Sequence, residues 1–289
     1  MIFKIKRFVI LILPAMVMIS CLGKFVESDV DKILKENEAT ITTYASKNAL
    51  NLTKDPSTGI YYRILSANPT GLVSGAKFDF YIAYSLGLLN GTQLEKKIAK
   101  DSTIINLYGT QLFDGFLASM LLLKEGEKGQ FLIPSYLAYA ESPPAGVSKN
   151  EVILLEIELL KLFSEDEKID LFIKRKKLNV TEKTTYGLRF IRTNEPTKEE
   201  VLKTGDVLSV KYNGMYLNET SFDSGTFPYT IGAGNVIVGF SEGLGKLKKG
   251  EKAKLVFPST LGYGTTGNSK IPPYAPLIFD VEILTVNGK

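Results

Sequence analysis

The two halves of this 289-residue chain repeat each other, and this duplication restricts the fold more than any other sequence feature. An offset of 128 residues aligns the early parts of the halves and pairs Tyr84 with Tyr212. After a difference of four residues, an offset of 124 aligns the later parts and pairs Tyr139 with Tyr263. Further matches join residues 51–53 to 179–181, 89–90 to 217–218, 115–116 to 239–240, 126–128 to 250–252, 134–135 to 258–259 and 155–158 to 279–282. The chain is therefore a tandem duplication of one structural unit.

Each unit is predicted to begin with a helix. In the first unit, Ser28 can cap a helix that continues to about Leu50. Its apolar stripe consists of Val30, Ile33, Leu34, Ile41, Tyr44 and Ala45. In the second unit, Ser164 and Glu167 form a capping box at the start of another helix. Strands are expected to follow at residues 60–65 and 187–191. We therefore divide the chain into residues 1–21, 22–163 and 164–289.

The first 21 residues have the features of a lipoprotein signal peptide. A basic start precedes an apolar run from Phe8 to Ile19, which is too short to cross a bilayer because spanning needs about 20 residues. Residues 18–21 (M-I-S-C) resemble a bacterial lipobox, in which the cysteine, here Cys21, becomes the lipid-carrying N-terminus. Other interpretations are an ordinary signal peptide with an incidental cysteine, or a short membrane anchor. The lipoprotein interpretation predicts a location in the bacterial cell envelope, on a face that the sequence does not determine.

The composition excludes several kinds of function. The chain has no histidine, and Cys21 is its single cysteine. These counts remove His/Cys metal sites, Ser-His and Cys-His nucleophile pairs, and intrachain disulfides. The net charge of +4 comes from scattered Lys and Glu residues rather than from a basic cluster typical of nucleic-acid binding. We expect no metal, no cofactor and no nucleic-acid partner.

A series of short motifs in the second unit carries a family resemblance. The motifs are V-K-Y-N-G (210–214), S-F-D-S-G (221–225), V-I-V-G-F (236–240), L-G-Y-G (261–264), I-P-P (271–273) and L-I-F-D-V-E-I-L (277–284). From about Thr185 to Val286, their order and spacing resemble the FKBP-type peptidyl-prolyl isomerases. The resemblance implies an α+β fold with two FKBP-like domains, each a twisted antiparallel sheet wrapped on a short helix and preceded by an N-terminal helix. The short helix should begin near Val236 in the second unit and near Leu112 in the first.

The activity that the resemblance implies is rotation about the peptide bond before proline. Amide resonance sets the barrier of about 18–20 kcal/mol, and no bond to another atom forms or breaks. A dry aromatic pocket that prefers the twisted amide is sufficient, so a chain without histidine can perform it. The residues that the resemblance assigns to this pocket are Tyr212, Phe222, Asp223, Phe227, Val236, Ile237, Phe240, Tyr263, Ile271 and Phe279.

The resemblance also implies individual roles. The backbone N–H of Ile237 and the hydroxyl of Tyr263 would hold ligand carbonyls, and Phe240 would form the floor where many members have Trp. Asp223 would place a carboxylate inside the pocket, where burial is costly unless it serves a purpose. Ile271 would lie on the overhanging loop beside the two prolines that follow it. Taken singly, each aromatic ring is equally compatible with a packed core.

The first unit keeps some of these positions and has lost others. It retains Tyr84, Phe116 and Tyr139. The positions of Phe222, Asp223 and Phe279 are occupied by Leu94, Glu95 and Leu155. The bulky residues Leu112 and Phe113 stand at the predicted start of the short helix. We expect the first unit to be structural or ligand-holding rather than catalytic.

Two hypotheses of different classes follow. The first is a lipoprotein whose second domain isomerises prolyl bonds in exported proteins, with macrolide inhibitors as further ligands. The alternative is a non-catalytic binding or scaffold lipoprotein that uses the FKBP fold to hold a partner. A surface protein for small molecules or glycans has no specific support. Asp223, Tyr263 and Phe279 favour the enzyme, whereas the changed first unit shows that the fold can persist without the site.

Overall fold

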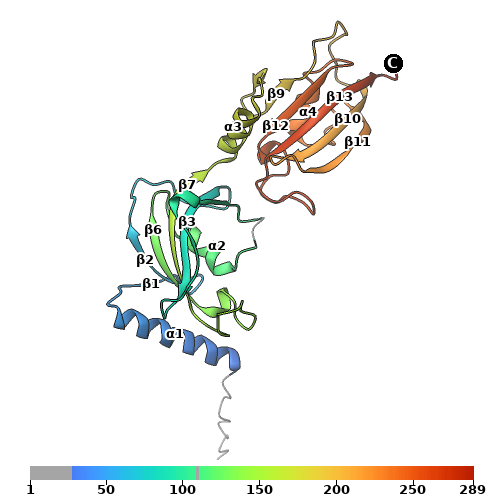
Figure 1. Ribbon diagram of the computed structural model, residues 1–289. Helices are drawn as coiled ribbons and strands as arrows, with labels where there is room; N and C mark the ends of the chain where they lie inside the picture. Colours follow the sequence, from blue (N-terminus) through green and yellow to red (C-terminus); the bar gives the residue numbers. More distant parts are fainter. Residues whose placement is uncertain (1–27, 109–110) are drawn as a thin grey trace, which may run out of the picture.

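The computed structural model describes residues 28–108 and 111–289, so the predicted signal peptide and Cys21 lie outside the described residues. The chain forms two α+β domains, each built on an antiparallel sheet with a short helix against one face (Figure 1). This arrangement confirms the predicted fold class.

The sheet of the first domain has seven strands in the order β1-β2-β6-β7-β3-β4, with β5 beside β3. The strands are β1 (Thr53–Lys54), β2 (Tyr61–Ser66), β3 (Asp79–Leu88), β4 (Gln93–Lys97), β5 (Thr103–Ile105), β6 (Lys128–Ile133) and β7 (Ile153–Phe163). The helices are α1 (Asp29–Lys47) and α2 (Asp114–Leu121), with 3-10 turns η1 (Ala99–Asp101) and η2 (Ser135–Leu137).

The sheet of the second domain has six strands in the order β11-β10-β13-β12-β9-β8. The strands are β8 (Glu182–Lys183), β9 (Arg189–Arg192), β10 (Val207–Tyr216), β11 (Ser221–Thr230), β12 (Lys252–Phe257) and β13 (Leu277–Val286). The helices are α3 (Glu165–Lys176) and α4 (Val238–Leu244), with the 3-10 turn η3 (Ser259–Leu261). This order matches the path β4-β3-β7-β6-β2-β1 of the first sheet, in which β5 is the additional strand.

The two sheets differ at one edge. In the second domain β11 runs unbroken along β10, whereas η1 divides the equivalent edge of the first domain into β4 and β5. The register makes Lys97 equivalent to Gly225 on one side of η1 and Thr103 equivalent to Phe227 on the other. The four extra residues of the first unit therefore lie at η1.

The short helices pack very close to their sheets. A Cβ atom on Gly239 of α4 would lie 2.7 Å from the ring of Phe257, and one on Gly115 of α2 would lie 2.3 Å from Ile133. Only glycine permits this approach. Each helix begins two residues later than predicted, because the extended residue before it, Ile237 or Phe113, is the N-cap.

Helix α3 covers the opposite face of the second sheet. Its Ser164–Glu167 capping box is present as predicted. Ile169 and Phe172 are buried against Val256 and other residues of that face, whereas Leu255 belongs to the core beneath α4. Successive side chains of a strand point to opposite faces, so the sheet is covered on both sides.

Helix α1 is shorter and less buried than predicted. Ser28 caps it, but it ends at Lys47 rather than near residue 50. Ile41 is buried against the first domain, whereas Val30 and Leu34 are 65% and 38% exposed. The predicted apolar stripe therefore packs only along its C-terminal half.

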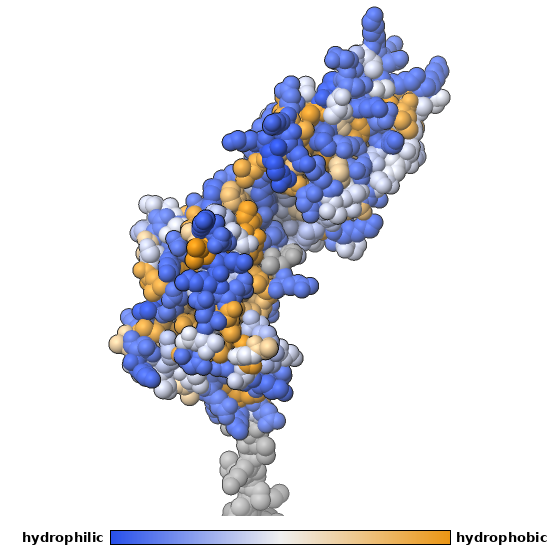
Figure 2. Space-filling view, in the orientation of Figure 1, coloured by the Kyte–Doolittle hydropathy of each residue, from blue (hydrophilic) through white to orange (hydrophobic). Residues whose placement is uncertain are grey.

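Only Ser164 separates β7 of the first domain from α3 of the second. Lys168 Nζ lies 2.9 Å from Oδ1 of Asp79 in the first domain, and the rings of Tyr108 and Tyr274 lie 5.9 Å apart. Figure 2 shows a mainly hydrophilic face with hydrophobic residues exposed in several places on the first domain. Within the described ranges, no helix has the length and apolar character needed to span a bilayer.

Candidate functional site

An open pocket of about 530 Å³ lies between α4 and the inner face of the second sheet. Strands β10, β11 and β13 supply one side, and the turn before α4 and the loop after η3 supply the other. Its lining residues are Tyr212, Phe222, Asp223, Phe227, Gly234, Asn235, Val236, Ile237, Phe240, Tyr263 and Phe279. The structure therefore brings together every predicted site residue except Ile271.

Aromatic rings form most of the walls and floor. Phe240, on α4, is buried and packs edge-to-face on Phe279 with ring centroids 5.2 Å apart. Tyr212 packs edge-to-face on Phe227 at 5.4 Å, and Phe222 packs on Phe279 at 5.7 Å. Such contacts hold each ring by its neighbours, so the apolar surface of the pocket is formed before any ligand arrives.

Asp223 lies at the exposed rim rather than in a buried interior. Its Oδ2 accepts a 2.9 Å hydrogen bond from the Tyr212 hydroxyl. Burial raises the pKa of Tyr212 above its usual value, and this hydrogen bond makes a smaller contribution in the same direction. Both effects keep the phenol protonated. The prediction of a costly buried carboxylate was wrong, because Asp223 lies on the edge strand β11 at the open rim of the pocket, where its side chain is exposed to solvent.

Two polar groups in the pocket are available to a ligand. Across residues 28–108 and 111–289, neither the backbone N–H of Ile237 nor the hydroxyl of Tyr263 has a hydrogen-bond partner. Both residues line the pocket. They can donate hydrogen bonds to carbonyl oxygens of an extended peptide. The described residues contain no group of three or more His, Cys, Asp or Glu side chains suited to a metal ion.

Ile271 is the predicted residue that the structure places elsewhere. Its backbone N–H donates to Oδ1 of Asn268, whose own N–H donates to the Ile271 carbonyl. This small turn directs the side chain into the core, where it is 1% exposed. Ile271 therefore supports the loop from within and does not line the pocket.

Two glycines and one asparagine at the site were not assigned to it from the sequence, although Gly214 ends the V-K-Y-N-G motif. Gly234 and Asn235 line the pocket just before α4, and Gly234 has a φ of +69°, which favours glycine. Gly214 lies beneath the rings: a Cβ there would be 2.7 Å from Phe222 and 2.8 Å from Phe279. The glycine-rich G-A-G-N segment at residues 232–235 was the available signal for the first two.

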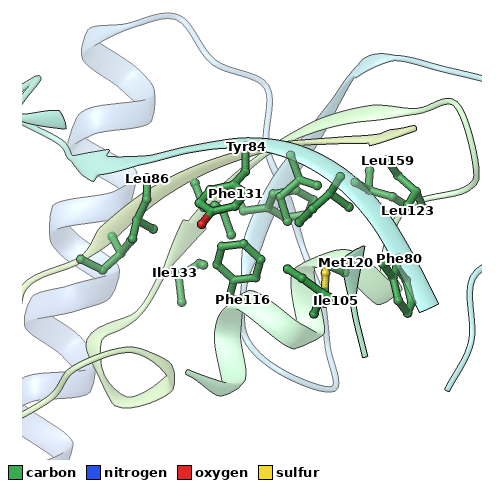
Figure 3. Packing of buried hydrophobic residues seen from close by; sticks show 14 of the residues in the cluster. Phe80, Tyr84, Leu86, Ile105, Phe116, Met120, Leu123, Phe131, Ile133 and Leu159 are labelled. Carbon is green, nitrogen blue, oxygen red and sulfur yellow. The ribbon is translucent and has the colours of Figure 1, made fainter. Parts of the chain in front are cut away.

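The first domain exchanges this arrangement for aliphatic packing. Leu86 stands where the second domain has Gly214, and it is buried beside Leu155 in the first core. Leu94 packs against the same cluster. Figure 3 shows Leu86 and Tyr84 on the sheet facing Phe116 from α2. A leucine thus fills the space that Gly214 leaves for two rings.

Phe113 fills more of the equivalent space. It takes the position of Ile237, and its ring packs edge-to-face on Phe116 at 5.9 Å and on Tyr139 at 5.2 Å. Burial raises the pKa values of Tyr84 and Tyr139, which keeps both phenols protonated. At the position of Phe227, the first domain has the smaller Thr103. Of the rings that line the second pocket, the first domain therefore keeps Tyr84, Phe116 and Tyr139 but lacks the equivalents of Phe222, Phe227 and Phe279.

Comparison with known proteins identifies the relatives of this chain. Residues 76–160 and 198–284 match the model of the FKBP-type peptidyl-prolyl cis-trans isomerase family. A probable FKBP-type peptidyl-prolyl cis-trans isomerase of Haemophilus influenzae is 31% identical over 215 residues, which cover 72% of this chain and 85% of the relative. The FK506-binding protein of Neisseria meningitidis serogroup B is 46% identical over 106 residues, which cover 35% of this chain and 96% of the relative.

A third relative is much longer than this chain. Human peptidyl-prolyl cis-trans isomerase FKBP9 is 30% identical over 208 residues, which cover 70% of this chain. The match spans about a third (33%) of the length of the human protein. The two matched segments of the family model lie one in each structural domain. This chain therefore belongs to the FKBP-type peptidyl-prolyl cis-trans isomerase family.

Proposed function

We propose that the second domain catalyses cis-trans isomerisation of peptide bonds that precede proline. The observation that carries the proposal is the ring-lined pocket, in which the Ile237 N–H and the Tyr263 hydroxyl have no hydrogen-bond partner among the residues that the structure describes. The first domain, with the same topology, packs Phe113 and Leu86 into the corresponding space.

The apolar surroundings that the pocket provides are enough to explain how it would speed rotation about the prolyl amide bond. A proline ring placed over Phe240 and between the rings of Tyr212 and Phe279 is removed from contact with water. The amide bond attached to this ring is removed from water with it. Planar amide resonance separates charge, so a dry apolar site favours the twisted form relative to water. Hydrogen bonds from Ile237 and Tyr263 to flanking carbonyls hold the peptide while the bond rotates. No nucleophile or acid–base pair is needed.

The packed interior of the first domain supports a non-catalytic role for it. Its helix α2 and sheet are complete, but its inner space is packed with aliphatic and aromatic side chains. The proposal assigns this domain to holding or positioning the protein whose prolyl bonds the second domain isomerises. The alternative for the whole chain, a binding or scaffold protein without catalysis, extends this role to both domains.

The isomerase proposal is tested with residues 22–289 and a proline-containing tetrapeptide. The expected result is faster approach to cis-trans equilibrium, inhibited by a macrolide of the FK506 type in proportion to occupancy of the pocket. A folded chain that binds unfolded proteins yet leaves the tetrapeptide rate at its uncatalysed value would favour the scaffold alternative.

We also propose that Cys21 carries lipid and anchors the protein in the bacterial cell envelope, so that its clients are exported proteins. The support is the apolar run from Phe8 to Ile19 that ends at the lipobox-like residues 18–21. Lipid chains contribute about 0.8 kcal/mol per buried CH₂, enough for firm membrane attachment when several are present. Cells fed radiolabelled fatty acid should label the full chain but not Cys21→Ser. Equal labelling of the two would contradict the anchor.

A further inference from the structure

We propose that Glu165, on α3, is a positioning residue that sets the hydroxyl of Tyr263 in the pocket. The inference deepens the proposed function and rests on it for its effect on catalysis. Glu165 lies outside the segment 198–284 that matches the family model, on a helix that covers the opposite face of the sheet from the pocket. Its influence must therefore pass through the chain between them.

The first link joins the carboxylate of Glu165 to Ser259. Oε2 accepts a 2.6 Å hydrogen bond from the backbone N–H of Ser259, and Oε1 accepts a 2.7 Å bond from its hydroxyl. Ser259 begins η3 and is 2% exposed. Hydrogen bonds to an ionised acceptor are stronger than neutral ones, particularly where water is excluded. Both carboxylate oxygens of Glu165 therefore hold the buried Ser259 in place.

The second link joins Ser259 to Tyr263. The carbonyl of Ser259 accepts hydrogen bonds of 2.8 Å from the N–H groups of Gly262 and Gly264, which flank Tyr263 on either side. The carbonyl of Gly264 in turn accepts from the N–H of Tyr274, at the far end of the overhanging loop. Hydrogen bonds thus hold the backbone on both sides of the tyrosine to Ser259, and hold Ser259 to Glu165 on α3.

The first domain provides an internal comparison. Asn37 of α1 and Ser135 of η2 occupy the positions of Glu165 and Ser259 under the duplication offsets. Oδ1 of Asn37 accepts a 2.6 Å bond from the Ser135 N–H, while Nδ2 donates to the Asn150 carbonyl at 3.0 Å. The Ser135 hydroxyl is buried without a partner among the described residues. The Asn37 amide therefore bonds to two different segments. The Glu165 carboxylate makes both of its bonds to Ser259, in the turn that precedes Tyr263.

The experiment compares kcat/KM in residues 22–289 for Glu165→Ala, Glu165→Gln and the matched first-domain variant Asn37→Ala. Glu165→Ala should lower kcat/KM about tenfold. Glu165→Gln should recover most of the loss, because its oxygen can accept from the Ser259 N–H while its NH₂ donates to the Ser259 hydroxyl. Asn37→Ala should change kcat/KM less than twofold, although it removes the same kind of tie from the first domain.

A double-mutant cycle with Tyr263→Phe separates positioning from a purely structural role. If Glu165 acts through the Tyr263 hydroxyl, Glu165→Ala should lower kcat/KM less than twofold further in the Tyr263→Phe background. It should still shift the urea midpoint there, because the tie to Ser259 is lost in both backgrounds. An equal fold-loss in kcat/KM with and without the hydroxyl would overturn the proposal.

The proposal can be decided even if the parent chain proves inactive, which would count against the proposed function alone. In protein with ¹³C-labelled tyrosine, Glu165→Gln and Glu165→Ala should change the Tyr263 ring signals in graded order. Glu165→Ala should also speed amide exchange at Gly264. Unchanged Tyr263 signals and unchanged Gly264 exchange in a folded Glu165→Ala protein would contradict the positioning role.

Discussion

The Tyr212 hydroxyl donates a 2.9 Å hydrogen bond to Asp223 at the rim of the second domain's pocket. The first domain keeps the equivalent bond, from Tyr84 to Glu95 at 2.7 Å, although its pocket is filled. The bond therefore belongs to the duplicated framework. What separates the two domains is the space at this strand position, which the rings of Phe222 and Phe279 occupy over Gly214 and the Leu86 side chain occupies in the first domain.

Gly214→Ala should damage the pocket directly. Its Cβ would lie 2.7 Å from the Phe222 ring and 2.8 Å from the Phe279 ring, so both rings must move. Overpacking of this kind costs about 1–3 kcal/mol. We expect weaker macrolide binding, measured by calorimetry. Gly225→Ala is the control, because its Cβ would meet nothing closer than 3.7 Å. Equal affinity in Gly214→Ala and the parent would show that the rings do not form the binding surface.

Gly239→Ala should separate helix α4 from the sheet. The new methyl would meet the buried ring of Phe257 at 2.7–2.8 Å, so the helix or the ring must shift. We expect a loss of about 1–3 kcal/mol in the local stability of the second domain. Amide exchange in β12 and β13 measures it.

The control for this change is Gly245→Ala at the end of the same helix. There the nearest atom is 3.6 Å from the new Cβ, and alanine is the better helix former by up to about 1 kcal/mol. Stability should stay the same or rise. If the amides of β12 and β13 exchange at the parent rate in both variants, the close packing of α4 on Phe257 does not contribute to the stability of the domain.

Acid should weaken the cap of α3 through Glu167. The backbone N–H of Ser164, aided by the Lys161 ammonium, lowers the pKa of Glu167 from 4.5 to about 2. A lowered folded-state pKa means that the stabilisation is present above the unfolded pKa of 4.5, levels off about one pH unit higher, and is lost as the pH falls through the folded pKa of about 2. The stability difference between the parent and Glu167→Gln should therefore be constant above about pH 5.5 and shrink progressively towards pH 2.

Urea midpoints at pH 6.5, 4 and 3 measure that difference. Glu199→Gln, at an exposed loop position, provides the matched charge change away from the cap. A gap between the parent and Glu167→Gln that is the same at pH 3 as at pH 6.5 would contradict the lowered pKa of Glu167.

The sequence alone predicted the features that depend on local pattern. The duplication offsets anticipated two sheets of one topology, and the Ser164–Glu167 pattern located the start of α3. Eight pocket residues were grouped by their motifs, and Phe227 follows one of these motifs by two residues, because the spacing of the motifs follows the strands and turns that carry them. The four-residue difference between the offsets corresponds to η1.

Features that depend on the tertiary environment were not predictable in this way. Asp223 is exposed at the open rim of the pocket on the edge strand β11, and that position depends on how the whole domain packs. Ile271 turns inward because of two hydrogen bonds with Asn268. The tie between Glu165 and Ser259 joins residues 94 positions apart, and no local pattern signals it.

The central claim is that catalysis resides in the second domain, and matched variants of residues 22–289 test it most directly. One carries Asp223→Ala and Tyr263→Phe, and the other carries the duplicate changes Glu95→Ala and Tyr139→Phe. We predict that the first pair lowers kcat/KM for a proline tetrapeptide at least tenfold, while the second pair stays within twofold of the parent. Equal losses from both pairs, or full activity after the second-domain changes, would contradict the account.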